Sequence, residues 1–159
     1  MWTRIRAVIA ASLLLLAGLL VTGCSEDFGA DQYGQKVPAA RLEGQWLLIN
    51  YWAEWCAPCR KEIPQLNRLA EQLKDSGVVV LGVNFDALQG DALTKASQQM
   101  GIAFTVLAQN PAARWQLPRS EVLPVTYIVS PQGELVQQLR GEQDAAGLHS
   151  LLLALGAIK

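Results

Sequence analysis

The chain has 159 residues, of which 51% are hydrophobic, and a formal net charge of -1 at pH 7. From this length we expect one domain with an adequate core and no second one. The near-neutral charge, with no cluster of basic residues, excludes a nucleic-acid-binding surface from the expected functions.

The first 23 residues have the pattern of a bacterial lipoprotein signal peptide. Two arginines precede an apolar stretch, residues 7–21, which is shorter than the roughly 20 residues that a membrane-spanning helix needs. Residues 21–24 (Val-Thr-Gly-Cys) resemble a lipobox, whose cysteine is lipidated and becomes the first mature residue. We therefore expect Cys24 to anchor the protein in a lipid bilayer, on the periplasmic face of the bacterial cell envelope. Ser25 favours the outer membrane over the inner one, and this choice stays open.

The rest of the chain alternates between strand and helix patterns. Residues 24–34 are polar and contain glycine, which indicates a lipid-anchored tether, and the folded domain is expected over 35–159. The pattern predicts strands at 46–52, 78–85, 125–129 and 134–139, and helices at 58–74, 90–100 and 145–155. Residues 103–107 favour a short further strand and 111–116 a short helix. Pro131-Gln132-Gly133 predicts a hairpin turn between the last two strands, which completes an α/β order of β-α-β-α-β-β-α.

Cys56 and Cys59 lie two residues apart where the first long strand gives way to a helix. Free amides and the positive end of the helix dipole stabilise a thiolate at such a turn, and the thiolate is the nucleophilic form of cysteine. With Cys24 lipidated, only these two cysteines can pair. A bridge that closes so short a loop removes little entropy from the unfolded chain. The pair therefore predicts thiol–disulfide exchange, with Cys56 attacking and Cys59 resolving.

Three segments carry a likeness to a known family. They are residues 50–64 (Asn-Tyr-Trp-Ala-Glu-Trp-Cys-Ala-Pro-Cys-Arg-Lys-Glu-Ile-Pro), residues 82–84 (Gly-Val-Asn) and residues 123–127 (Leu-Pro-Val-Thr-Tyr). On these motifs the chain resembles the thioredoxin superfamily, and within it the membrane-tethered TlpA/ResA-like thiol–disulfide oxidoreductases. The resemblance implies a thioredoxin-like α/β fold, with a central mixed sheet flanked by helices. It also implies a short N-terminal β-hairpin, at residues 34–44.

The resemblance also implies a substrate-binding surface. In that family the peptide bond before a downstream proline is cis, and its loop lies against the two cysteines. The bond between Leu123 and Pro124 occupies this place. We expect this loop to contact the substrate together with Trp55, Ala57 and Pro58, which surround the first cysteine in the sequence.

Glu62 is the third residue implied to be catalytic, because ResA-like proteins carry a glutamate at this position. A carboxylate near a thiol raises the pKa of the thiol and can exchange a proton with it. The alternative is a solvent-facing residue near the helix N-terminus. Asn50 stands where cytosolic thioredoxins place a buried aspartate, and it cannot take up a proton.

By resemblance, the protein is a reductase of protein clients that contain disulfides. Proteins of cytochrome c maturation or oxidase assembly are the clients that the family suggests, and a membrane electron donor of the DsbD/CcdA type would re-reduce the cysteines. Two alternatives stay open: a disulfide-donating oxidant or isomerase, and a metal-binding or structural lipoprotein. We expect no metal and no cofactor, because two cysteines without a nearby histidine cannot complete a tetrahedral zinc site.

Overall fold

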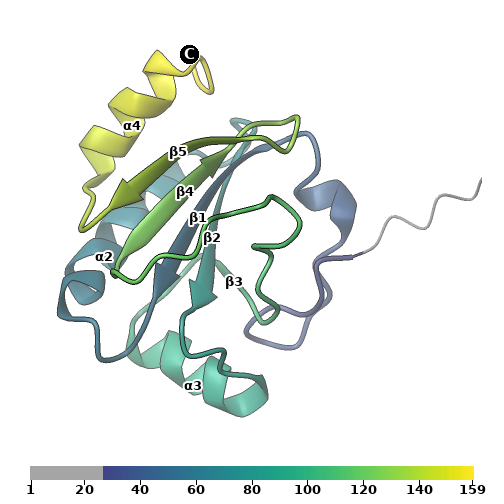
Figure 1. Cartoon of the computed structure of the whole chain (residues 1–159), viewed down its shortest axis with the longest axis vertical. Coiled ribbons are helices and arrows are strands. Elements are labelled where there is room, and N and C mark those ends of the chain that lie inside the picture. Colours follow the sequence, from purple (N-terminus) through teal and green to yellow (C-terminus); the bar gives the residue numbers. More distant parts are fainter. Residues whose placement is uncertain (1–26) are drawn as a thin grey trace, which may run out of the picture.

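A five-stranded mixed sheet with the strand order β3-β2-β1-β4-β5 organises the structure (Figure 1). The computed structural model describes residues 27–159. Its strands are β1 (Trp46–Trp52), β2 (Val78–Asn84), β3 (Thr105–Leu107), β4 (Val125–Val129) and β5 (Leu135–Arg140). β1, β2 and β3 are parallel, whereas β4 is antiparallel to both β1 and β5. The expected fold class, a mixed α/β sheet with helices, is confirmed.

Three α-helices connect and flank the strands: α2 (Ala57–Gln72), α3 (Gly90–Gln99) and α4 (Ala145–Ala154). Each begins and ends within two residues of its predicted bounds. α2 continues through Pro64, whose ring is on the exposed side of the helix, where water can bind the carbonyl group that loses its donor. No helix within residues 27–159 is both long and apolar enough to span a membrane.

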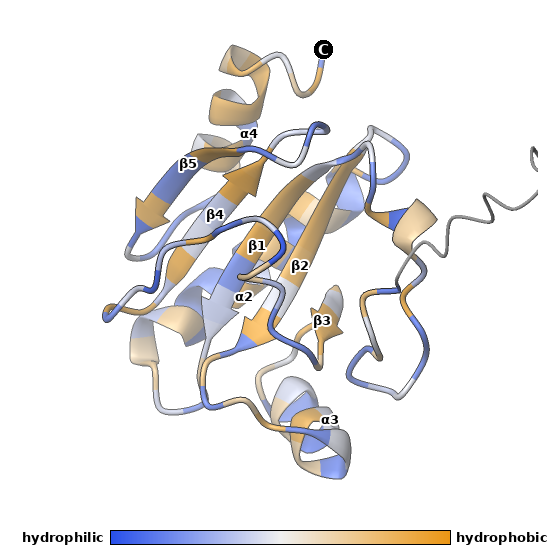
Figure 2. Cartoon of the chain, turned by 45° about the vertical axis from the view of Figure 1, so that its right-hand side comes forward, coloured by the Kyte–Doolittle hydropathy of each residue, from blue (hydrophilic) through white to orange (hydrophobic). Residues whose placement is uncertain are grey.

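The sheet separates two clusters of buried side chains. Leu48 and Trp52 of β1 face the cluster that includes buried residues of all three α-helices. Leu47 and Tyr51, the alternating neighbours, face a second cluster on the other side. That side is covered by residues 28–42 and by the long connection between β3 and β4. β1 and β2 consist mostly of hydrophobic residues, as expected of strands that are covered on both faces (Figure 2).

The folded part of the chain begins earlier than we expected. Phe28, which we assigned to the tether, is only 6% exposed, and its ring stacks on Trp115 with 5.2 Å between the centroids. Gln32 is buried as well and donates to the carbonyl oxygen of Phe104 at 3.0 Å. The boundary at residue 35 was therefore wrong, because local polarity did not reveal contacts with residues more than 70 positions away.

The N-terminal hairpin is present, but it spans residues 28–37 and overlaps the predicted residues 34–44 only in part. A single antiparallel bridge joins Ala30 to Lys36, and the Asp31 carboxylate closes the turn by accepting from the amides of Tyr33 and Gln35. Residues 39–41 form a short 3-10 helix instead of a strand. The hairpin therefore consists of one bridge and a side-chain-capped turn, which a search for alternating strands does not find.

Residues 112–116 form consecutive turns, and the short helix that we predicted at 111–116 is not formed. Gln116 has a left-handed backbone, with φ of 50°, and the amide of Leu117 donates to the carbonyl oxygen of Ala112 at 2.9 Å. Pro118 then has no amide hydrogen with which to extend a helix. Burial of Trp115 fixes the segment against the sheet, so tertiary contacts override its weak helical pattern.

Candidate active site

Cys56 and Cys59 form a disulfide at the N-terminus of α2. Cys56 is the N-cap residue, with an extended backbone, and its sulfur accepts a hydrogen bond from the amide of Cys59 at 3.2 Å. Pro58 lies in the first turn of the helix, where an amide hydrogen would have no intrahelical acceptor. The sulfur of Cys56 therefore lies where the free amides and the helix dipole stabilise negative charge.

The two sulfurs differ in their surroundings. Cys59 is completely buried and Cys56 is 4% exposed, but the neighbours of Cys56 reach the surface. Trp55 is 66% exposed, and Ala57 is exposed as well. Pro58 is half-buried. Cys56 thus lies directly beneath an exposed rim, whereas Cys59 is buried in the core. Only Cys56 is therefore positioned to react with a thiol or disulfide of another protein.

The loop before β4 lies at the same edge of the sheet. The peptide bond between Leu123 and Pro124 is cis, as the resemblance implied. Val125, the next residue, pairs with Tyr51, so Pro124 is level with the end of β1, from which the chain leads to Cys56. Leu123 is half-buried and packs against the cluster that contains both cysteines. The residues predicted to bind substrate are therefore gathered at one end of the sheet.

Glu62 is fully buried, which excludes the alternative that it is a solvent-facing residue near the helix N-terminus. It follows Cys59 by three positions, so the two side chains are neighbours on one helix face. Its carboxylate accepts hydrogen bonds from the side-chain amide of Asn50 at 2.9 Å and from the backbone amide of Gln143 at 3.2 Å. Burial raises the pKa of Glu62 from 4.5 to about 7, although both hydrogen bonds oppose the shift. This carboxyl group can therefore gain or lose a proton near neutral pH.

Asn50 holds Glu62 in place, a role that sequence reasoning missed. Its amide nitrogen donates to Glu62 and also to the hydroxyl of Thr126 at 3.0 Å. The amide oxygen of Asn50 is buried and has no hydrogen-bond partner within residues 27–159. The sequence showed only that Asn50 cannot titrate. The partners Thr126 and Gln143 are distant in the chain, and nothing in the local sequence connects them to Glu62.

Cys24, the expected lipidation site, lies outside the described residues. Ser25 lies outside them as well. The predicted catalytic and substrate-binding residues lie at or next to the disulfide, at the ends of β1 and α2 and in the loop before β4.

Comparison with known proteins agrees with this geometry. The AhpC/TSA family model matches residues 23–138. Thiol-disulfide oxidoreductase ResA of Bacillus thuringiensis (strain Al Hakam) is 29% identical over 122 residues, which cover 77% of this chain and 70% of the relative. ResA of Bacillus subtilis (strain 168) is 25% identical over 122 residues, with 77% and 68% covered.

Solved structures show the same fold. A thiol:disulfide interchange protein of the thioredoxin family from Chlorobium tepidum TLS superposes with a TM-score of 0.68 at 21% identity, covering 82% of this chain and 92% of that protein. The chain therefore belongs to the AhpC/TSA family, and it is a thioredoxin-like thiol–disulfide oxidoreductase similar to ResA.

Proposed function

We propose that this protein is exported, anchored by a lipid on Cys24, and works as a reductase of disulfides in client proteins of the cell envelope. The observation that carries the proposal is the Cys56–Cys59 pair, which caps a helix beside a buried carboxyl group that titrates near neutral pH. Export and anchoring rest on the N-terminal sequence, with its apolar stretch and lipobox-like residues 21–24.

The reaction needs only the two thiols and a proton acceptor. The thiolate of Cys56 attacks one sulfur of the client disulfide, and the other client sulfur leaves as a thiolate that takes up a proton. Cys59 then attacks the sulfur of Cys56, which breaks the mixed disulfide and releases the second client thiol. Two electrons pass to the client, and the Cys56–Cys59 disulfide remains. An external dithiol of the DsbD/CcdA type closes the cycle by reducing it.

Glu62 supports this mechanism as the group that accepts the proton of Cys59 before Cys59 attacks. Its pKa of about 7 matches that task at neutral pH. Once ionised, the carboxylate disfavours a neighbouring thiolate and thereby raises thiol pKa values. Strong oxidants of this fold depend on a stabilised reduced form. A buried carboxylate beside the cysteines acts against such stabilisation, and this favours the reductase over the oxidant.

Clients can be trapped with Cys59→Ser. Without the resolving thiol, the mixed disulfide between Cys56 and a client persists, so we expect covalent adducts in cells that dissolve on treatment with a reductant. Cys56→Ser/Cys59→Ser is the matched control and should give none. Non-reducing gels and mass spectrometry identify the adducts, and an absence of adducts, or the same adducts in the control, contradicts the proposed mechanism.

A further inference from the structure

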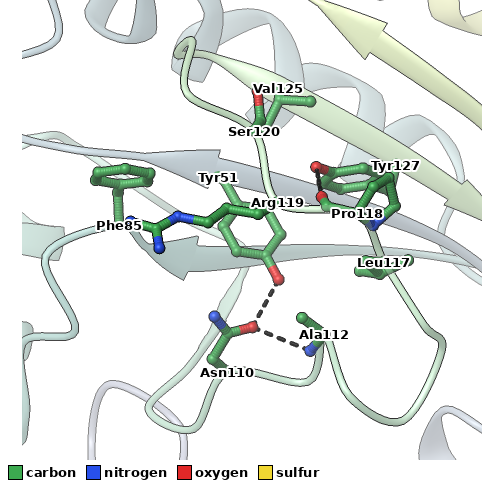
Figure 3. A pocket seen from close by; sticks show the side chains of 10 residues that line it. All are labelled: Tyr51, Phe85, Asn110, Ala112, Leu117, Pro118, Arg119, Ser120, Val125 and Tyr127. Atoms are coloured by element: carbon green, nitrogen blue, oxygen red, sulfur yellow. Dashed lines mark hydrogen bonds between the residues drawn. The ribbon is translucent and has the colours of Figure 1, made fainter.

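A cavity of about 360 Å³ lies on the sheet face opposite α2 and α4, beneath the connection between β3 and β4 (Figure 3). Its floor contains Tyr51 of β1 together with Val125 and Tyr127 of β4, all of them buried. Phe85 and Arg119 form part of its lining and are exposed, and Figure 3 shows the Arg119 side chain extending toward Phe85. The cavity therefore combines a buried aromatic floor with a solvent-accessible mouth that carries one positive charge.

Two segments connect the pocket with the disulfide. The ring of Phe85 packs edge-on against Trp55, with 6.1 Å between the centroids, and Trp55 directly precedes Cys56. On the other side Val125 directly follows Pro124, in the loop at the end of β1. Trp55 thus contacts the lining of the pocket, and the loop before β4 leads directly into it. When a client is bound at Cys56, the client residues next to its cysteine can therefore reach the pocket.

The polar groups of the lining indicate what the pocket binds. The Tyr51 hydroxyl donates to the side-chain oxygen of Asn110 at 2.7 Å, and the Tyr127 hydroxyl donates to the carbonyl oxygen of Pro118, so both tyrosine protons are used within the wall. Among residues 27–159 the Arg119 guanidinium forms no ion pair, and Arg119 is the one charged residue of the lining. An aromatic ring fits the floor, and a carboxylate fits the mouth.

We propose that this pocket binds an aromatic side chain of the client, close to the client cysteine and next to an acidic residue. The ring packs against Tyr51 and Tyr127, and the acidic residue pairs with Arg119 at the mouth. This inference rests on the proposed function, because it assigns the class of client sequence that the oxidoreductase prefers.

Peptide binding tests the pocket without any redox step. The probes are fluorescently labelled peptides with serine in place of the client cysteine, preceded by Phe-Glu, Ala-Glu or Phe-Gln. We expect the Phe-Glu peptide to bind the wild-type protein about tenfold more tightly than the Ala-Glu peptide, because burial of one aromatic side chain contributes an affinity gain of that size. Fluorescence anisotropy measures the three affinities, and equal affinities for Phe-Glu and Ala-Glu overturn the proposal.

Two variants locate the binding. Ala112→Leu places a larger side chain in the lining and should reduce the preference for phenylalanine to less than about threefold, whereas Ala113→Leu, an exposed neighbour outside the lining, is the matched control and should keep it. Arg119→Gln should abolish the preference for Phe-Glu over Phe-Gln. This second variant changes an exposed residue, so the test remains even where Ala112→Leu does not fold. A preference for phenylalanine that survives in folded Ala112→Leu, or one for glutamate that survives in Arg119→Gln, overturns the proposal.

Disulfide reduction and peptide preference distinguish the proposed function from the pocket assignment. If the wild-type protein reduces disulfides but shows no preference among the peptides, the pocket assignment is wrong and the proposed function stands. If it prefers the Phe-Glu peptide but reduces no disulfide, the proposed function is wrong and the pocket assignment stands.

Discussion

Cys56→Ser is expected to lower the rate of disulfide reduction by on the order of 10³-fold or more, because a serine hydroxyl stays protonated where a cysteine forms a thiolate. Cys56 is the residue that caps α2 beneath an exposed rim, and Cys59, which is fully buried, cannot replace it in the first attack. The measurement is kcat/KM for reduction of insulin disulfides, with dithiothreitol as the electron donor.

The control for this experiment is an exposed serine far from the site. Ser150→Ala, on α4, should reduce insulin at the wild-type rate. Circular dichroism confirms that Cys56→Ser retains the fold. A folded Cys56→Ser protein that works within about threefold of the wild-type rate would show that the attacking group is not Cys56.

Glu62→Gln is expected to remove a pH dependence of stability. The pKa of Glu62 is about 7 in the folded protein and 4.5 ordinarily, so between these values the folded state binds a proton that the unfolded state has released. Stability therefore falls as the pH rises from about 4.5 to 7. The shift corresponds to about 3 kcal/mol, which the wild-type protein should lose over this window and Glu62→Gln should not.

Urea unfolding of the oxidised proteins at pH 4.5, 6 and 8 measures this difference. Glu71→Gln removes an exposed carboxylate from the same helix and should follow the wild-type curve. If the stabilities of wild type and Glu62→Gln remain parallel across the three pH values, the carboxyl group of Glu62 does not titrate as the structure indicates.

The same variant tests the proton role in catalysis. In the reduced protein, the rate of Cys56 alkylation should depend on pH differently in wild type and in Glu62→Gln, because removal of a nearby carboxylate lowers the pKa of the thiols. Identical pH profiles would leave Glu62 with a structural role alone.

The sequence predicted those parts of the structure that depend on local pattern. The strand at 125–129 coincides with β4, and the cysteine pair lies at the strand-to-helix turn as the spacing indicated. These features follow from continuous apolar runs and from turn residues, and the sequence contains both. The resemblance added the cis bond before Pro124.

Other features depend on contacts between distant segments and could not be predicted. Glu62 is buried and accepts a hydrogen bond from the backbone amide of Gln143, 81 residues away. Its raised pKa follows from this burial, which only the three-dimensional arrangement produces. Phe28 is buried because Trp115 stacks on it. The pocket beside Phe85 likewise exists because the irregular connection before β4 folds over the sheet.

The reduction potential of the Cys56–Cys59 pair tests the central claim most directly. It is measured by equilibrating the purified protein with glutathione or dithiothreitol buffers and following the fraction of free thiols. We predict a value of about -270 mV, as expected of a reductant whose thiolates a buried carboxylate disfavours. A value of about -120 mV, typical of a strong disulfide donor, would contradict the assignment as a reductase.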